Sequence, residues 1–195
     1  MKWATRILIH FDRVASAWLI LRFIDAQAEF IFLEEGQSPP DDVTPFALPG
    51  ARLAVHGGGA TTFQRILEAH SLDDPALAVM SHIASAIVGH VTEDPTRDSL
   101  ATRDPHVTGV LAIAEGIMLL SATDDECLMR SLPLYDALHA RLRAAIELER
   151  LVPSPPASIF EQTVQFAKAT GALRNSNVPF TGDAFAKALR ALRTT

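Results

Sequence analysis

The fold is decided by residues 3–33, which read WATRILIHFDRVASAWLILRFIDAQAEFIFL. Residues 3–10 end in an apolar, β-branched run and predict a first strand. A helix capped by Asp12 and ending near Asp25 is expected next, and residues 29–33 predict a second strand. Because parallel strands need a crossover connection, this strand–helix–strand order favours parallel pairing of the two strands.

One further short strand and a series of helices are expected beyond this stretch. The strand is predicted at 52–56, after a proline-rich loop, and the pair Thr61 and Gln64 forms a capping box for the next helix. The polar segment 91–106, twice interrupted by proline, predicts a long loop of the kind that is often functional. The helix at 107–121 is apolar on nearly every side and is expected to be central. The later helices are predicted at 75–88, at 107–121, from 123 to about 151 with a kink or break before Pro133, at 158–170 and at 181–193.

These elements predict an α+β protein with an α/β-like N-terminal part. We expect a small, mainly parallel sheet of about three to four strands, packed with helices and followed by a mostly helical C-terminal half. The proline-rich segment 153–156 is the strongest linker candidate. Residues 1–150 are therefore expected to form the main domain, and residues 151–195 a helical extension packed on it.

Composition limits the classes of protein to which the chain can belong. Its 195 residues are 48% hydrophobic, which is enough for one sizeable core without disulfides or a structural metal. A net charge of −6 argues against nucleic acid as a partner of the whole surface. The single cysteine, Cys127, excludes an intramolecular disulfide and any CxxC motif. The apolar run 107–120 is too short to span a bilayer and the first residues do not resemble a signal peptide, so we expect a cytoplasmic protein without a membrane partner.

Two places in the sequence repeat one arrangement, in which a predicted strand delivers the chain to the start of a helix. The first is the segment 9–13, and the second runs through Gly57, Gly58 and Gly59 to Thr62. Helix N-termini carry unpaired N–H groups and a partial positive charge. Both places are therefore candidate anion sites, although three successive glycines are also typical of a tight turn.

Helix geometry sorts the charged residues beside the first of these sites. Arg13 and Ser16 lie about 60° apart at 100° per residue, so both can face the crevice. Arg22 lies on the opposite side and is expected to pair with Asp25 or to stack on Trp18. The alternative is an ordinary structural role, in which Arg13 forms a local ion pair and Ser16 packs in the core.

Seven histidines raise the question of a metal site. His56, at the end of a predicted strand beside the glycines, is the first candidate, and His82 and His90 are weaker ones. The last two are eight residues apart, which is too far for a simple chelating pair on one helix. No HExxH motif is present. A metal-dependent enzyme that uses these histidines near the glycine-rich loop, with 91–106 as a lid, stays open as an alternative.

The opening run is long enough to suggest a family. The motif WxTR at 3–6, followed by DRxASAWLIxRFID at 12–25, resembles the signature of the ChrB-type chromate-resistance domain. Later motifs extend the resemblance over roughly residues 3–145: PFxLPG at 45–50, HGG at 56–58, TF at 62–63, LxDPAL at 72–77, DDE at 124–126 and LYDAL at 134–138. The resemblance implies a part in the bacterial response to chromate, in a family associated with chromate-efflux operons and described as chromate-sensing regulators.

Two positions depart from the family's usual pattern. Gln64 stands where the family usually has a glutamate, and Gly89-His90 stands where it has an acidic cluster with a His-Asp pair. If those groups bind metal or transfer protons in the family, this chain lacks part of the set.

Helix ends, arginines and the resemblance converge on an oxyanion site. Chromate is a tetrahedral oxyanion, and such ions suit arginine forks and helix N–H groups. We therefore expect a chromate-binding, sensing or regulatory domain, whose partner is a small oxyanion such as chromate and for which no cofactor is assigned. The metal-dependent enzyme and a dimerising interaction module are the alternatives, so a homodimer stays open. The predicted ligand-binding residues are Arg6, Asp12, Arg13, Ser16, His56, Gly57, Gly58, Gly59 and Thr62.

Overall fold

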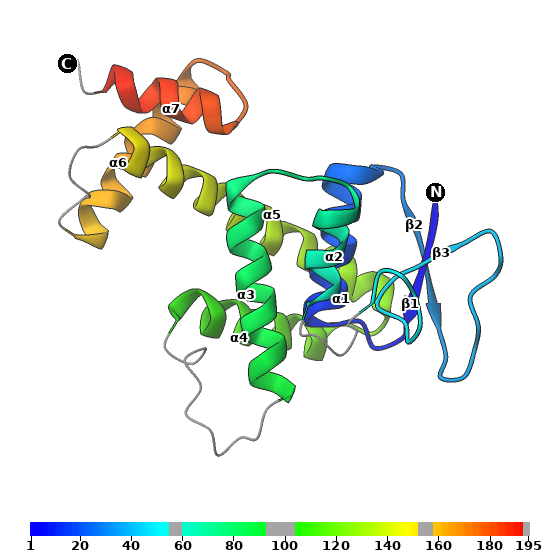
Figure 1. Ribbon diagram of the computed structural model, residues 1–195. Helices are drawn as coiled ribbons and strands as arrows, with labels where there is room; N and C mark the ends of the chain where they lie inside the picture. The colour runs from blue at the N-terminus through cyan, green and yellow to red at the C-terminus, as the bar shows by residue number, and fades with distance from the viewer. Residues whose placement is uncertain (55–59, 93–103, 152–157, 193–195) are drawn as a thin grey trace. The chain divides into compact units, whose positions relative to one another are not determined.

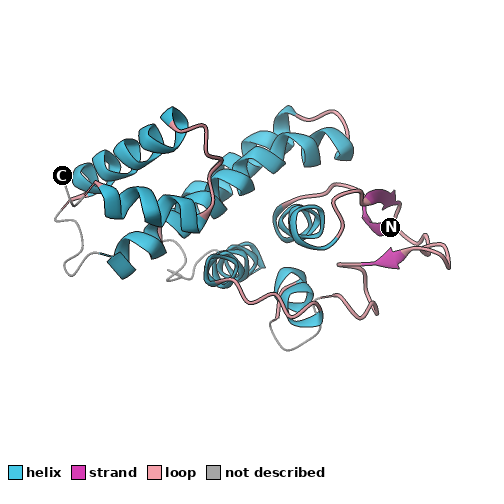
Figure 2. Ribbon diagram, turned by 90° about the horizontal axis from the view of Figure 1, so that it is seen from above, coloured by secondary structure: helices cyan, strands magenta, loops and turns pink. Residues whose placement is uncertain are grey.

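The computed structural model describes residues 1–54, 60–92, 104–151 and 158–192, whose elements are labelled in Figure 1. Helices dominate the described chain, and the strands lie near the N-terminus (Figure 2). This arrangement confirms the predicted α+β class with a helical C-terminal half. In chain order the elements are β1 (Lys2–Arg6), α1 (Phe11–Leu19), the π-helix η1 (Ile20–Ile24), β2 (Glu29–Leu33), β3 (Thr44–Pro45), α2 (Thr62–Ala69), α3 (Pro75–Thr92), α4 (Pro105–Leu120), α5 (Asp124–Leu151), α6 (Ile159–Asn175) and α7 (Gly182–Ala191).

The sheet has the strand order β2-β1-β3, and both pairings are parallel. β1 pairs with β2 along its whole length, from Lys2 opposite Glu29 to Arg6 opposite Leu33. This register confirms the parallel pairing predicted from the strand–helix–strand order. Because β1 is the central strand, its carboxyl end and the start of α1 lie at the middle of the sheet edge.

Two strand predictions are wrong in detail. The first strand ends at Arg6, because Leu8 has a φ of +56° that turns the chain out of the extended conformation. The third strand is Thr44–Pro45, inside the predicted proline-rich loop, and not 52–56. In the described part of 52–56 the chain makes one isolated bridge instead of a strand. Residues 55 and 56 lie outside the described residues.

Helix α1 begins at Phe11 with His10 in the N-cap position, so Asp12 does not cap it as predicted. The helix then widens into η1, where the amide of Asp25 donates to the carbonyl of Ile20 at 2.8 Å. Such π-helical turns are rare and often accompany functional sites. Together α1 and η1 occupy the predicted helix, and α1 is buried on most sides, as its apolar composition predicts.

The predicted N-cap of α2 is confirmed, but the capping box is incomplete. Thr61 is the N-cap residue, and its hydroxyl accepts a hydrogen bond from the amide of Gln64 at 3.2 Å. The Gln64 side chain does not complete the box; it donates to Glu68 at 3.0 Å. A local sequence signal therefore sets the start of α2, which faces the region where α1 begins.

Helix α4 is not central, contrary to the prediction. Its buried residues are Val107 and Val110, near its start, whereas Leu119 and Leu120 are 80% and 72% exposed. A helix that is apolar all round has no preferred face, so its composition cannot indicate which part packs. Its neighbour among the described helices is α3.

Helix α5 continues without a break through Pro133, and α6 passes through Gly171 to end at Asn175 rather than near 170. Both residues are poor helix formers, but a helix held by tertiary packing tolerates them. Local propensity therefore gives the wrong end for α6.

The described residues divide into two compact units, Met1–Tyr135 and Asp136–Thr195. Within the second unit, the C-terminal part of α5 joins α6 and α7 around a core that contains Leu148 and Phe185. The predicted boundary at 150 and the packing of the extension on the main domain stay predictions.

Candidate anion-binding site

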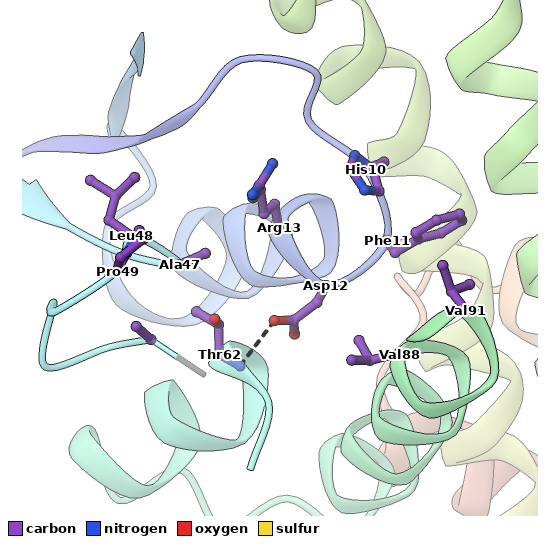
Figure 3. Close-up of a pocket in the computed structure, with 11 residues that line it drawn as sticks. His10, Phe11, Asp12, Arg13, Ala47, Leu48, Pro49, Thr62, Val88 and Val91 are labelled. Atoms are coloured by element: carbon purple, nitrogen blue, oxygen red, sulfur yellow. Dashed lines mark hydrogen bonds between the residues drawn. The ribbon is translucent and has the colours of Figure 1, made fainter. Parts of the chain in front are cut away.

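A cavity of about 380 Å³ lies where β1 leads into α1, within the first unit. Figure 3 shows its walls, which come from the start of α1, the loop 47–49, the start of α2 and the end of α3. Ligands of parallel sheets commonly bind at this end of the strands. The polar lining residues are His10, Asp12, Arg13 and Thr62, and the apolar ones are Phe11, Ala47, Leu48, Pro49, Ala54, Val88 and Val91.

Asp12 is buried and caps a helix other than its own. Its carboxylate accepts hydrogen bonds from two amides in the first turn of α2, that of Thr62 at 2.9 Å (Figure 3) and that of Phe63 at 3.1 Å. Burial raises the pKa of Asp12, while the two amides, the Thr62 hydroxyl and the charge of Arg13 act in the opposite direction. The start of α2, predicted as an anion site, is thus already occupied by an anion of the protein itself.

Arg13 is the half-buried cation of the cavity. Burial lowers the pKa of its guanidinium, the Asp12 and Asp124 carboxylates oppose this effect, and the charge of Arg6 adds to it. The Arg13 guanidinium nevertheless stays protonated, because arginine side chains do not lose their proton in proteins. Among the described residues, none lies within hydrogen-bond or ion-pair distance of its guanidinium. No described residue therefore takes up its donors.

The two other polar groups predicted on this side of the site lie elsewhere. Arg6 does not line the cavity; its guanidinium donates to the carbonyls of Glu34 at 2.5 Å and Gln37 at 2.8 Å and braces the turn after β2. Ser16 is fully buried, and its hydroxyl has no hydrogen-bond partner among the described residues. Ser16 therefore lies in the core and does not line the cavity, whereas Thr62 does.

His56, Gly57, Gly58 and Gly59 lie outside the described residues, so their predicted role stays a prediction. His82 is exposed on α3, and His90 is half-buried on the same helix. In residues 1–54, 60–92, 104–151 and 158–192, no group of three His, Cys, Asp or Glu side chains could hold a metal ion.

Strained backbone surrounds the cavity, and the sequence analysis missed it. Phe11 and Ala47, both lining residues, have φ values of +43° and +52°, and Leu8 just before α1 has +56°. Side chains other than glycine rarely adopt this region, and such residues tend to cluster at functional sites. No glycine marks these positions, so the linear sequence carries no signal for the strain.

A comparison with known protein families finds a match, and it covers the region of the cavity. The family described as "ChrB, C-terminal domain" matches residues 3–142, which include every described lining residue of the cavity. The chain belongs to this family. The match confirms the resemblance drawn from the opening run, and with it the coarse expectation of a chromate-resistance-related protein.

One relative of this ChrB-family chain is Protein ChrB of Cupriavidus metallidurans. It is 44% identical over 73 residues, which make up 37% of this chain and 22% of that protein. The chain therefore matches less than a quarter of its relative's length. No solved structure matches the chain significantly. Among the described helices, none combines the length and the apolar character needed to cross a membrane.

In this ChrB-family chain one face of α5 holds the backbone that leads into α1. The Asp124 carboxylate accepts from the amides of Leu8 at 3.1 Å and Ile9 at 2.6 Å. Further along the same face, the Cys127 thiol donates to the carbonyl of Ile9 at 3.5 Å, and the Tyr135 hydroxyl donates to that of Phe11 at 3.4 Å. Residues 124, 127 and 135 lie on one side of a helix at 100° per residue.

We refer to Asp124, Cys127 and Tyr135 as the α5 clamp. Burial raises the pKa of Cys127 and of Tyr135, so both stay protonated and can act as donors at neutral pH. The sequence marked Asp124 and Tyr135 as parts of later family motifs, at 124–126 and 134–138, and Cys127 as the single cysteine. Their contacts with Leu8, Ile9 and Phe11 could not be read from the sequence, because they join segments more than 100 residues apart.

Proposed function

We propose that this chain binds chromate or a similar oxyanion through Arg13 and acts as the sensing domain of a chromate-resistance protein. The observation that carries the proposal is a half-buried guanidinium that lines a cavity and has no protein partner among the described residues. Taking a cation partly out of water is costly unless an anion compensates it. A bound oxyanion supplies that compensation through charge-assisted hydrogen bonds.

The position of Arg13 supports sensing rather than mere binding. It lies in the first turn of α1, two residues after the strained Phe11, whose carbonyl is held by Tyr135. An anion bound to Arg13 interacts with a segment whose backbone has an unusual conformation at Phe11. A small displacement there changes contacts on α1, α2 and α5 together, and this gives the domain a means of reporting the ligand.

The first experiment measures the binding of chromate, sulfate and phosphate by calorimetry to the wild-type chain, Arg13→Ala and Arg13→Lys. We expect saturable binding to the wild type, and a loss of about 1–3 kcal/mol in Arg13→Ala, the scale of a lost charged hydrogen bond. Arg13→Lys should retain part of the affinity, because it keeps the charge but not the fork of donors.

Arg190→Ala is the matched control, because it removes the same charge from an exposed position in the second unit. Its affinity should equal that of the wild type. If chromate binds to Arg13→Ala as tightly as to the wild-type chain, the assigned site is wrong. If only divalent metals bind, the metal-dependent alternative takes its place.

A further inference from the structure

The cavity is larger than an inorganic oxyanion requires. Chromate and sulfate have five non-hydrogen atoms, and at about 30 Å³ for each water-sized atom they fill at most about 150 Å³. The cavity measures about 380 Å³, in the range typical of sites for small organic molecules. More than half of its volume therefore lies beyond the reach of an ion seated on Arg13.

Most of the described lining residues are apolar. In Figure 3, Arg13 lies between the loop that carries Leu48 and Pro49 and the end of α3 that carries Val88 and Val91. None of these four side chains offers a hydrogen bond to an oxyanion. They do offer a surface on which a hydrocarbon group gains free energy by leaving water.

The charges near Arg13 favour a ligand with a single negative charge. One basic group, Arg6, and two acidic groups, Asp12 and Asp124, act on the Arg13 guanidinium. Arg6 and both aspartates already bond to backbone groups of the protein. One guanidinium thus remains to neutralise one charge of a ligand.

We propose that the cavity accepts an organic monoanion whose acidic head group binds Arg13 and whose apolar body packs on Leu48, Pro49, Val88 and Val91. The inference rests on the proposed function, because both place the negative charge at Arg13. It adds that carboxylates or sulfonates with a hydrocarbon part bind this site better than inorganic oxyanions of similar charge. The apolar wall, and not the arginine alone, then decides which anion the protein recognises.

A series of alkanesulfonates tests this inference, because the head group and its charge stay constant while the apolar part grows. Methanesulfonate, butanesulfonate and hexanesulfonate are titrated against the full chain, with chromate as the reference. We expect the affinity to rise by up to roughly fourfold for each methylene that becomes buried, and hexanesulfonate to compete with chromate. Arg13→Ala should weaken every member of the series.

A pair of isosteric variants isolates the apolar wall. Val91→Thr replaces one methyl group of the lining by a hydroxyl without changing the shape, and its 51% exposure makes the change compatible with folding. Val79→Thr makes the same change at a 38% exposed position of α3 that does not line the cavity. We expect Val91→Thr alone to lower hexanesulfonate affinity, by roughly threefold, and to leave chromate affinity unchanged.

The outcomes separate this inference from the proposed function. If chromate binding depends on Arg13 but sulfonate affinity does not grow with chain length, the proposed function stands and the organic ligand is rejected. If affinity grows with chain length but is the same in Arg13→Ala, or in Val91→Thr, the hydrocarbon binds elsewhere and the inference is also rejected. If no anion binds at all, both proposals fail.

Discussion

Asp12 and Arg13 are neighbours in the sequence but interact with different parts of the molecule. Asp12 is buried against the first turn of α2, and Arg13 lines the cavity without a partner among the described residues. Successive residues of a helix point 100° apart, so two adjacent charges reach different surroundings. Asp12 thus satisfies α2, whereas the described residues supply no partner for the Arg13 guanidinium.

The environment of Asp12 predicts a pH dependence of stability. Its pKa in the folded protein is raised above the ordinary value of 3.8 by burial. At a pH between the ordinary pKa and the raised pKa, the folded state holds more protons than the unfolded chain. The Asp12 contribution to the free energy of unfolding is therefore largest at low pH and is lost as pH rises through the raised pKa. Asp12→Asn lacks this group and should lack this trend.

The measurement is urea denaturation of the wild type and Asp12→Asn in steps from about pH 4 to pH 7. The free energy of unfolding of the wild type, minus that of the variant, should fall across this range. Asp73→Asn, at an exposed position, serves as the control and should show no such trend. A difference that is flat or rises with pH would show that the helix amides, and not burial, dominate at Asp12.

At the scale of elements, α5 does more than pack against α1. The α5 clamp takes up two amides and two carbonyls of the segment Leu8–Phe11, which leaves the sheet before α1 begins. Backbone groups that leave a sheet need new partners when they are buried. Helix α5 supplies them and in this way fixes where α1, and Arg13 with it, starts.

The clamp predicts unequal effects for two adjacent aspartates. Asp124→Ala removes the acceptor of two backbone amides, and we expect it to lower the free energy of unfolding by about 1.5–3 kcal/mol. Asp125→Ala removes the same charge from the same helix turn at an exposed position, and it should cost about 0.3–1 kcal/mol through the helix dipole. Urea denaturation measures both values. Equal losses would mean that Asp124 acts only through the dipole and does not hold the loop.

At the scale of the whole molecule, the cavity and the core of α6 and α7 belong to different units. The cavity is lined by residues of Met1–Tyr135, and the family match ends at residue 142. Neither α6 nor α7 contributes a lining residue among those described. We therefore expect the second unit to affect stability without affecting the recognition of the anion.

Phe185→Ala tests this separation. Phe185 is fully buried in the second unit and stacks edge-on against Phe166, so its truncation should cost about 3–5 kcal/mol. Phe180→Ala, at a 43% exposed position, should cost clearly less. The affinity for chromate should be the same in both variants and the wild type below their unfolding temperatures. A loss of affinity in Phe185→Ala would show that the second unit supports the anion site.

The residues that could be predicted are those whose role depends on near neighbours in the chain. The first crossover, the Thr61 cap and the placement of Arg13 at the start of a helix follow from local patterns. The ends of strands and the burial of helices were less predictable. β1 stops at Arg6, and the buried residues of α4, Val107 and Val110, lie near its start. Local propensity cannot show where tertiary contacts override it.

The parallel sheet around β1, the helical composition of the rest and the family could be predicted, because each depends on the order or identity of residues. Which of the described charges have partners follows from tertiary contacts. Asp12 reaches the start of α2 across 50 residues, and Asp124 reaches Leu8 across 116. Whether a carboxylate or a guanidinium is satisfied depends on partners at such distances along the chain. For that reason the sequence predicted nine ligand-binding residues, and the fold leaves Arg13 as the available charge among those described.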